Sequence, residues 1–262
     1  LARSGGVFLG EQHSVRGVGV RTYGTGDRAA TLIWLHGGGW VYGEPEGDDE
    51  ILAHLAARCD VDVVAVRYRL APEHPFPAAL DDALAVYQHI AKSGRPIVIA
   101  GASAGATLAA GLCLLLRDRG DNQPAAQLLI CPPLDDQARD DDDGPLRRAD
   151  MDRYWRMYLG AAEPNSYAAP ARAHTTAGLA PAHIYTTSAD PLRLEGWRYA
   201  GRLAADGVEV NARFLPGGFH GFEYEAPRSA FSRRFLSEIA STVRNVTRSP
   251  RASRHATGTV PA

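Results

Sequence analysis

The sequence of 262 residues has few cysteines, little net charge and no long apolar run, and each shortage excludes a class of protein. Its three cysteines, Cys59, Cys113 and Cys131, stand far apart, so a disulfide framework is not expected. A formal net charge of −2 gives no electrostatic attraction for nucleic acid or an acidic membrane. The longest apolar stretch, residues 104–116, is too short to cross a bilayer. We therefore expect no nucleic-acid partner and no membrane span.

The sequence also lacks internal repeats and a visible export signal. Its amino end has no basic segment followed by an apolar one, so the cytoplasm is the default expectation, although the first residue is Leu rather than Met. The length suits one large domain with a core of its own. We expect a single domain over residues 1–247, with an inserted lid region over residues 134–170, and a disordered tail over residues 248–262.

Short apolar runs alternate with longer runs of helical period along most of the chain. Strands are predicted at residues 31–35, 61–68, 96–100, 127–131, 183–189 and 209–215. Helices are predicted at residues 49–58, 78–92, 104–119, 192–206 and 226–243. This alternation predicts an α/β fold, a mostly parallel central sheet with helices on both faces.

The alternation breaks at residues 134–170, where an acidic run precedes an aromatic stretch. We interpret residues 151–159 as a helix of an inserted segment. The acidic run, residues 140–143, favours a solvated turn over a metal site, because contiguous Asp side chains point in different directions. No metal or other cofactor is predicted.

Ser103 is the candidate nucleophile, at the centre of the motif Gly-Ala-Ser-Ala-Gly over residues 101–105. The motif stands between a predicted strand and a predicted helix, where a sharp turn strains the serine backbone and leaves room only for small neighbours. Such a turn presents the hydroxyl over a helix amino terminus, which stabilises negative charge. A small-residue helix start without chemistry is the alternative, and the strand-turn-helix context disfavours it.

A glycine-rich segment, His-Gly-Gly-Gly-Trp over residues 36–40, follows the first predicted strand. Glycines let backbone N–H groups approach a substrate carbonyl oxygen, so the segment predicts an oxyanion hole with donors from Gly38, Gly39 and Ala104. A phosphate-binding loop is the alternative, but neither a Lys-Ser/Thr pair nor a Gly-x-Gly-x-x-Gly helix entry accompanies the glycines.

A serine hydroxyl needs a base, and the base needs a carboxylate that fixes its tautomer. Asp190 ends one predicted strand and His220 follows the last one, in a Pro-Gly-Gly segment that we expect to be a flexible loop. Taken singly, Asp190 reads as a helix cap and His220 as a surface residue. Together with Ser103 they complete a Ser-Asp-His order, with Glu195 as the reserve acid.

With these motifs identified, residues 15–243 resemble the hormone-sensitive-lipase-like family of bacterial carboxylesterases. The matching segments are residues 36–43, 68–79, 101–105, 190–193 and 220–222. The resemblance implies the α/β-hydrolase fold and hydrolysis of short-chain carboxylic esters through a serine acyl-enzyme, without a cofactor. It also supports Gly38, Gly39 and Ala104 as oxyanion donors.

Two residues depart from the family pattern near the predicted site. Ala102 stands where the family often has Asp or Thr, and Leu194 stands where an acidic residue is common. Neither departure removes a member of the predicted triad.

The family also commonly carries a helical cap ahead of the glycine-rich loop, and here that cap is short or absent, since 35 residues precede His36. We therefore expect an open acyl pocket, covered only by the insertion over residues 134–170. Its Tyr154, Trp155 and Tyr158 would form an exposed apolar surface that serves either substrate or a homodimer.

The predicted function is ester hydrolysis by Ser103, His220 and Asp190, with a small-molecule ester as substrate. An amidase or peptidase could use the same three residues. A ligand-binding member of the fold without catalysis is a further alternative, and so is a truncated, poorly folding fragment. We expect activity to fall as His220 protonates, near the ~6.5 of an unperturbed imidazole.

Overall fold

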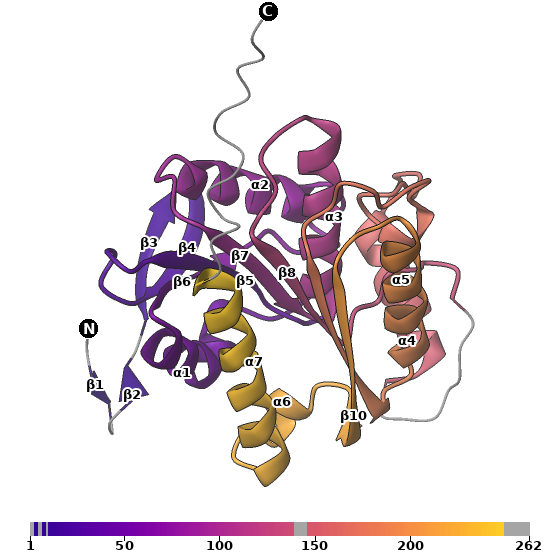
Figure 1. Ribbon diagram of the computed structural model, residues 1–262. Helices are drawn as coiled ribbons and strands as arrows, with labels where there is room; N and C mark the ends of the chain where they lie inside the picture. The colour runs from indigo at the N-terminus through magenta and orange to yellow at the C-terminus, as the bar shows by residue number, and fades with distance from the viewer. Residues whose placement is uncertain (1–2, 5–6, 9, 139–145, 249–262) are drawn as a thin grey trace, which may run out of the picture.

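Eight strands form one central sheet, in the order β10-β9-β8-β7-β5-β6-β4-β3 (Figure 1). The computed structural model describes residues 3–4, 7–8, 10–138 and 146–248. The strands are β3 Glu11–Val15, β4 Val18–Tyr23, β5 Ala30–Leu35, β6 Val61–Arg67, β7 Ile97–Ala102, β8 Ala126–Ile130, β9 Ala182–Ala189 and β10 Val210–Phe219. All neighbours from β10 to β6 are parallel, and β4 and β3 join antiparallel. Two short strands, β1 Arg3–Ser4 and β2 Val7–Phe8, pair separately.

The central strands are apolar on both sides because helices cover both faces of the sheet. On β7, Ile97 and Ile99 face one hydrophobic core, and Val98 and Ala100 face the other. Successive side chains of a strand point to opposite faces, so a strand buried on both faces reads as a continuous apolar run. The short apolar runs of the sequence are these strands.

Two groups of helices make the outer layers (Figure 1). One core packs α2 Ala78–Ala91, α3 Ala104–Asp118 and α5 Arg193–Ala205 against the sheet. The other packs α1 Asp49–Cys59 and α7 Ala230–Arg248. The remaining helices are α4 Arg148–Leu159, α6 Phe222–Glu225 and the 3-10 helices Pro45–Asp48 and Pro170–Arg172. The predicted α/β class is therefore confirmed.

The predicted elements are confirmed with small shifts of their ends, apart from two at the carboxyl-terminal side. The predicted helix over residues 226–243 begins later, at Ala230, and continues to Arg248 as α7, and the unpredicted short helix α6 ends just before it at Glu225. The predicted strand over residues 209–215 continues to Phe219 as β10. The predicted acidic turn at residues 140–143 and the predicted tail beyond Arg248 lie outside the described residues.

Among the described residues, no helix combines the length and the apolar character that a membrane crossing requires.

The carboxyl ends of the parallel strands meet at one edge of the sheet. The glycine-rich loop leaves β5 there, Ser103 follows β7, Asp190 follows β9 and His220 follows β10. In an open α/β sheet this edge is where ligands bind. The topology therefore brings the predicted site residues to one place.

Candidate active site

Ser103 occupies a strained turn between β7 and α3. Its φ of 51° and ψ of −121° lie outside the regions that L-residues favour. A side chain at Gly105 would place its Cβ 2.0 Å from the carbonyl oxygen of Leu35, so only glycine fits there. The Ser103 N–H donates to the Ile130 carbonyl oxygen at 2.8 Å, which ties the turn to β8. The predicted small-residue turn is confirmed.

His220 lies between Ser103 and Asp190. Its Nε2 is 2.9 Å from Ser103 Oγ, and its Nδ1 is 3.1 Å from Asp190 Oδ1. With the proton on Nδ1, the ring donates to the carboxylate and accepts from the serine hydroxyl. The three residues come from the ends of three different strands and form one hydrogen-bonded row.

An irregularity in β10 sets the position of His220. Leu215 pairs with Thr187 of β9, and the next registered pair is Phe219 with Ala189. Between these pairs β10 advances four residues while β9 advances two, so the extra length bulges. The Gly217 N–H donates to Ser188 Oγ at 2.9 Å and anchors the bulge. The expected flexible loop is wrong here, since this segment belongs to the sheet.

Burial and charge act in opposite directions on the His220–Asp190 pair. Burial lowers the pKa of His220, but the charge and hydrogen bond of Asp190, together with the charges of Glu223 and Glu195, outweigh burial, and the net pKa lies above the ordinary value. Burial raises the pKa of Asp190, and the His220 charge and its other hydrogen bonds bring the net value below the ordinary one. The geometry favours an ionised aspartate beside a histidine that protonates readily.

Asp190 is fully buried, at 0% exposed. Its Oδ1 also accepts the Leu192 N–H at 2.8 Å, and its Oδ2 is buried without a hydrogen-bond partner among the described residues. Cys131, Asp190 and His220 are the one grouping of three potential metal ligands in the described part of the chain. Two of the three already bond each other, so a metal would have to separate them.

Glu195, the reserve acid, is buried and occupied elsewhere. Its Oε2 accepts the N–H groups of Leu134 and Asp135 at 2.7 and 2.8 Å. Both ring nitrogens of His220 already have Ser103 and Asp190 as partners. Glu195 therefore anchors the segment after β8 and is not the partner of His220.

Gly38 and Gly39 form the turn of the loop after β5. Gly38 has a φ of 114°, and a Cβ there would lie 2.0 Å from the Tyr42 carbonyl oxygen. Across the described residues, no hydrogen bond takes up the N–H of either glycine. Ala104 is the first residue of α3, so its N–H has no carbonyl partner within the helix. Among the described residues, the N–H groups of all three predicted donors therefore lack a backbone acceptor and remain available to an oxyanion.

His36 supports the loop and is not an acid or base of the reaction. Burial lowers its pKa to about 4, so the ring is neutral. Its Nδ1 lies 2.7 Å from the Gly37 carbonyl oxygen, and its ring stacks on Tyr68 with centroids 4.1 Å apart. The Tyr68 hydroxyl donates to the His36 carbonyl oxygen at 2.7 Å. Sequence reasoning missed Tyr68, since the contact spans 32 positions.

The aromatic residues of the insertion pack against the same loop. Trp40 stacks on Tyr158 with ring centroids 4.4 Å apart, and its centroid lies 4.5 Å from that of Trp155. Trp155 is 5% exposed and Tyr158 1%. The expected exposed apolar surface is therefore wrong for these two residues. Trp155 and Tyr158 pack against Trp40 of the loop. Of the three aromatic residues, only Tyr154 is half-buried.

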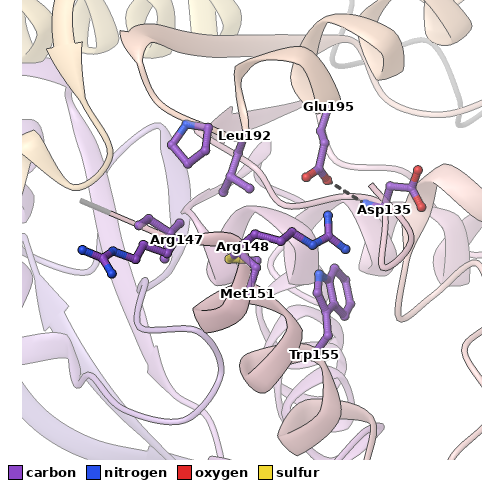
Figure 2. A pocket seen from close by; sticks show the side chains of 9 residues that line it. Asp135, Arg147, Arg148, Met151, Trp155, Leu192 and Glu195 are labelled. Atoms are coloured by element: carbon purple, nitrogen blue, oxygen red, sulfur yellow. Dashed lines mark hydrogen bonds between the residues drawn. The ribbon is translucent and has the colours of Figure 1, made fainter. Parts of the chain in front are cut away.

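A small cavity lies beside the segment that follows Asp190 (Figure 2). Its volume is about 20 Å³, close to the space of one water molecule and too small for an acyl chain. It is lined by Asp135, Leu146, Arg147, Arg148, Met151, Trp155, Pro191, Leu192 and Glu195. A larger hollow of about 310 Å³ borders Thr31 and Asp62, at the amino ends of β5 and β6 and so at the edge opposite the triad.

Two buried carboxyl groups near the site carry no sequence motif. Glu223 is 4% exposed and Asp48 is 1% exposed. Burial raises the pKa of each to about 7. The position of Glu223, three residues after His220 in α6, was the one signal available in the sequence, and a lone Glu there is also an ordinary surface residue.

A sequence model described as alpha/beta hydrolase fold matches residues 32–224. Esterase LipI of Mycobacterium tuberculosis is 38% identical over 218 residues, which cover 76% of this chain and 68% of LipI. The carboxylic ester hydrolase LipN of the same organism is 36% identical over 75% of this chain. The chain spans only 58% of the length of LipN.

A solved structure shares the whole architecture. It is described as an esterase from the bacterial hormone-sensitive lipase family and superposes with a TM-score of 0.87 at 25% identity. The superposition covers 94% of this chain and 87% of that one. The sequence and structural likenesses point to the same group of proteins.

Proposed function

The chain belongs to the alpha/beta hydrolase fold family, with hormone-sensitive-lipase-like esterases among its relatives, and we propose that Ser103, His220 and Asp190 are its catalytic triad. The chain is a carboxylic ester hydrolase, as its named relatives are. The observation that carries the triad is the row from Ser103 Oγ through His220 to Asp190, at 2.9 and 3.1 Å.

In the acylation step, Ser103 Oγ bonds to the ester carbonyl carbon while its proton passes to His220 Nε2. Asp190 stabilises the imidazolium that forms. The tetrahedral intermediate then breaks its bond to the alkoxy oxygen, which leaves as the alcohol with the proton from Nε2. An acyl-enzyme on Ser103 remains.

In the second step, water attacks the acyl carbon and gives a proton to His220 Nε2. Ser103 Oγ leaves with that proton, and the carboxylic acid is released. In both steps the N–H groups of Gly38, Gly39 and Ala104 stabilise the oxyanion, because they are fixed before charge develops. Their lack of other acceptors supports this role.

We propose that the substrates are small-molecule esters with short acyl chains. A relative named ethyl acetate hydrolase, from Pseudomonas putida and 32% identical over 217 residues, supports this size class. A nucleic-acid partner is not proposed, since the net charge is −2. Location in the cytoplasm stays a prediction. A homodimer also stays a prediction, and burial of Trp155 and Tyr158 removes the argument from an exposed insertion.

The test is hydrolysis of p-nitrophenyl esters from acetate to palmitate by the purified chain and by Ser103→Ala. We expect turnover that is greatest for short acyl chains and falls at least about 10,000-fold in the variant, because the nucleophile is lost. Ser237→Ala, a serine on the exposed side of α7, is the matched control and should keep full activity.

Three results would change the proposal. Full activity of Ser103→Ala would show that Ser103 is not the nucleophile. Turnover of amides in place of esters would point to an amidase with the same triad. Binding of esters without turnover would point to a ligand-binding protein of this fold.

A further inference from the structure

The oxyanion loop is tied to the helix that follows the catalytic histidine. The Gly37 N–H donates to the Tyr224 hydroxyl at 3.3 Å, across 187 positions of sequence. Tyr224 lies in α6, which begins two residues after His220. A Cβ on Gly37 would lie 3.4 Å from this hydroxyl and 3.6 Å from Ser103 Cβ, so the contact is adjacent to the nucleophile.

A buried carboxyl group, that of Asp48, neighbours the Tyr224 hydroxyl. Asp48 ends the 3-10 helix that closes the loop, and its Oδ2 accepts the Trp34 Nε1–H at 2.6 Å. Burial raises the pKa of Asp48 to about 7, while the hydrogen bond from Trp34 and the neighbouring Tyr224 hydroxyl act to lower it. The other oxygen, Oδ1, is buried and has no hydrogen-bond partner among the described residues. The neighbouring Tyr224 hydroxyl is a donor that could turn to it.

The protonation of Tyr224 suits this arrangement. Burial, with the neighbouring Asp48 charge next, raises the pKa of the phenol well above its ordinary value. The hydroxyl therefore keeps its proton at working pH. Since its oxygen accepts from Gly37, the proton is free to point to Asp48. The residue as a whole is 37% exposed.

We propose that Tyr224 is a positioning residue for the oxyanion hole: its hydroxyl fixes the Gly37 amide, Asp48 fixes the hydroxyl, and both thereby orient the N–H groups of Gly38 and Gly39. This inference rests on the proposed ester hydrolysis. Anchoring the Gly37 N–H fixes one planar peptide at the start of the loop, and this limits where the amides of the two residues that follow can lie. Oxyanion stabilisation depends steeply on donor placement, because the donors act on charge that develops only during the reaction.

The test is Tyr224→Phe, which removes the hydroxyl and keeps the ring. We expect kcat on p-nitrophenyl acetate to fall about 10- to 100-fold, while KM changes less than about twofold. Affinity for a trifluoromethyl ketone, which forms an oxyanion on Ser103, should weaken by a similar factor. All rates are divided by the number of active sites counted from the p-nitrophenol burst, so partial unfolding does not enter.

Two further variants separate positioning from general damage. Tyr87→Phe removes a buried hydroxyl that donates to the Asn122 carbonyl oxygen at 2.7 Å, away from the site, and should leave kcat unchanged. Asp48→Asn should lower kcat in wild type and have little further effect in Tyr224→Phe, because Asp48 acts through the phenol.

The outcomes are distinguishable. A Tyr224→Phe enzyme with kcat and ketone affinity within about twofold of wild type overturns the positioning role and leaves the esterase intact. A rise in KM at constant kcat also overturns it, since Tyr224 would then be a substrate contact. Absence of ester hydrolysis in the wild-type chain overturns the proposed function itself.

Discussion

Two buried carboxyl groups act on the same histidine from different elements and carry opposite pKa shifts. Asp190, at the end of β9, bonds His220 and the Leu192 N–H, and its net pKa lies below the ordinary value. Glu223, in α6, is also buried, but its Oε2 has no hydrogen-bond partner among the described residues, and burial raises its pKa to about 7. The two carboxyl groups are buried to a similar degree, so their hydrogen-bond and charge partners decide whether each is ionised.

The comparison shows what a buried acid needs in order to stay ionised. Desolvation disfavours charge at both positions, and only directed donors and an adjacent cation reverse it. Asp190 has these and is equipped to stabilise an imidazolium. At Glu223 a backbone hydrogen bond and the His220 charge do not outweigh burial, so it is neutral over much of the acid range. It influences His220 mainly at higher pH, where its charge raises the pKa of the imidazole.

Asp190→Asn removes the ionised carboxylate of this pair and should have the largest effect. The amide cannot stabilise the imidazolium and favours the wrong tautomer, so kcat should fall about 10,000-fold, with the fold retained. Steady-state hydrolysis of p-nitrophenyl acetate measures this. Glu195→Gln is the matched control, because Glu195 bonds backbone amides rather than His220, and it should stay within a few-fold of wild type. The reverse pattern would make Glu195 the acid of the triad.

Glu223→Gln would sharpen the comparison through stability. In the unfolded chain a Glu ionises near ~4.3, so between that pH and about 7 the unfolded state releases a proton that the folded state keeps. Folding stability falls with pH across this interval by up to about 3 kcal/mol and is level above it. The variant removes this loss, so its advantage over wild type should grow from pH 4.5 to 7. Urea unfolding at pH 4.5, 6 and 8 measures it. An advantage independent of pH would mean that folded Glu223 is already ionised.

The smallest expected effect is on the pH profile of kcat/KM. Activity needs neutral His220. Burial lowers the pKa of this imidazole, Asp190 raises it, and the net pKa lies above the ordinary value of a histidine. The acid limb should therefore have its midpoint above ~6.5, higher than an unperturbed imidazole predicts. In Glu223→Gln the midpoint should move down, since a charge that raises the pKa is lost. A midpoint below ~6.5 in wild type would contradict the dominance of Asp190.

Much of the site could be predicted from the sequence because its rules are local. Ser103 needs small neighbours within two residues, and Gly105 meets the Leu35 carbonyl at a distance that no side chain permits. Strand ends placed Asp190 and His220 because side-chain alternation and strand order define the carboxyl edge of the sheet.

What supports the oxyanion loop could not be predicted in the same way. The stacking of Tyr68 on His36, the burial of Trp155 and Tyr158 on Trp40, and the bond from Gly37 to Tyr224 join segments far apart in sequence. An aromatic side chain has no local pattern that separates a buried support from an exposed lid. The expectation of an exposed insertion failed for this reason.

Because of the bulge between Leu215 and Phe219, catalysis depends on the number of residues in this segment. Side chains along a strand alternate between faces, so deleting one residue from positions 216–218 would move the imidazole out of phase with Asp190 without changing any catalytic residue. Homologous sequences that keep the chemistry should therefore conserve the number of residues between these two positions more strictly than their identities. Insertions and deletions there would mark members of the fold that have lost hydrolysis.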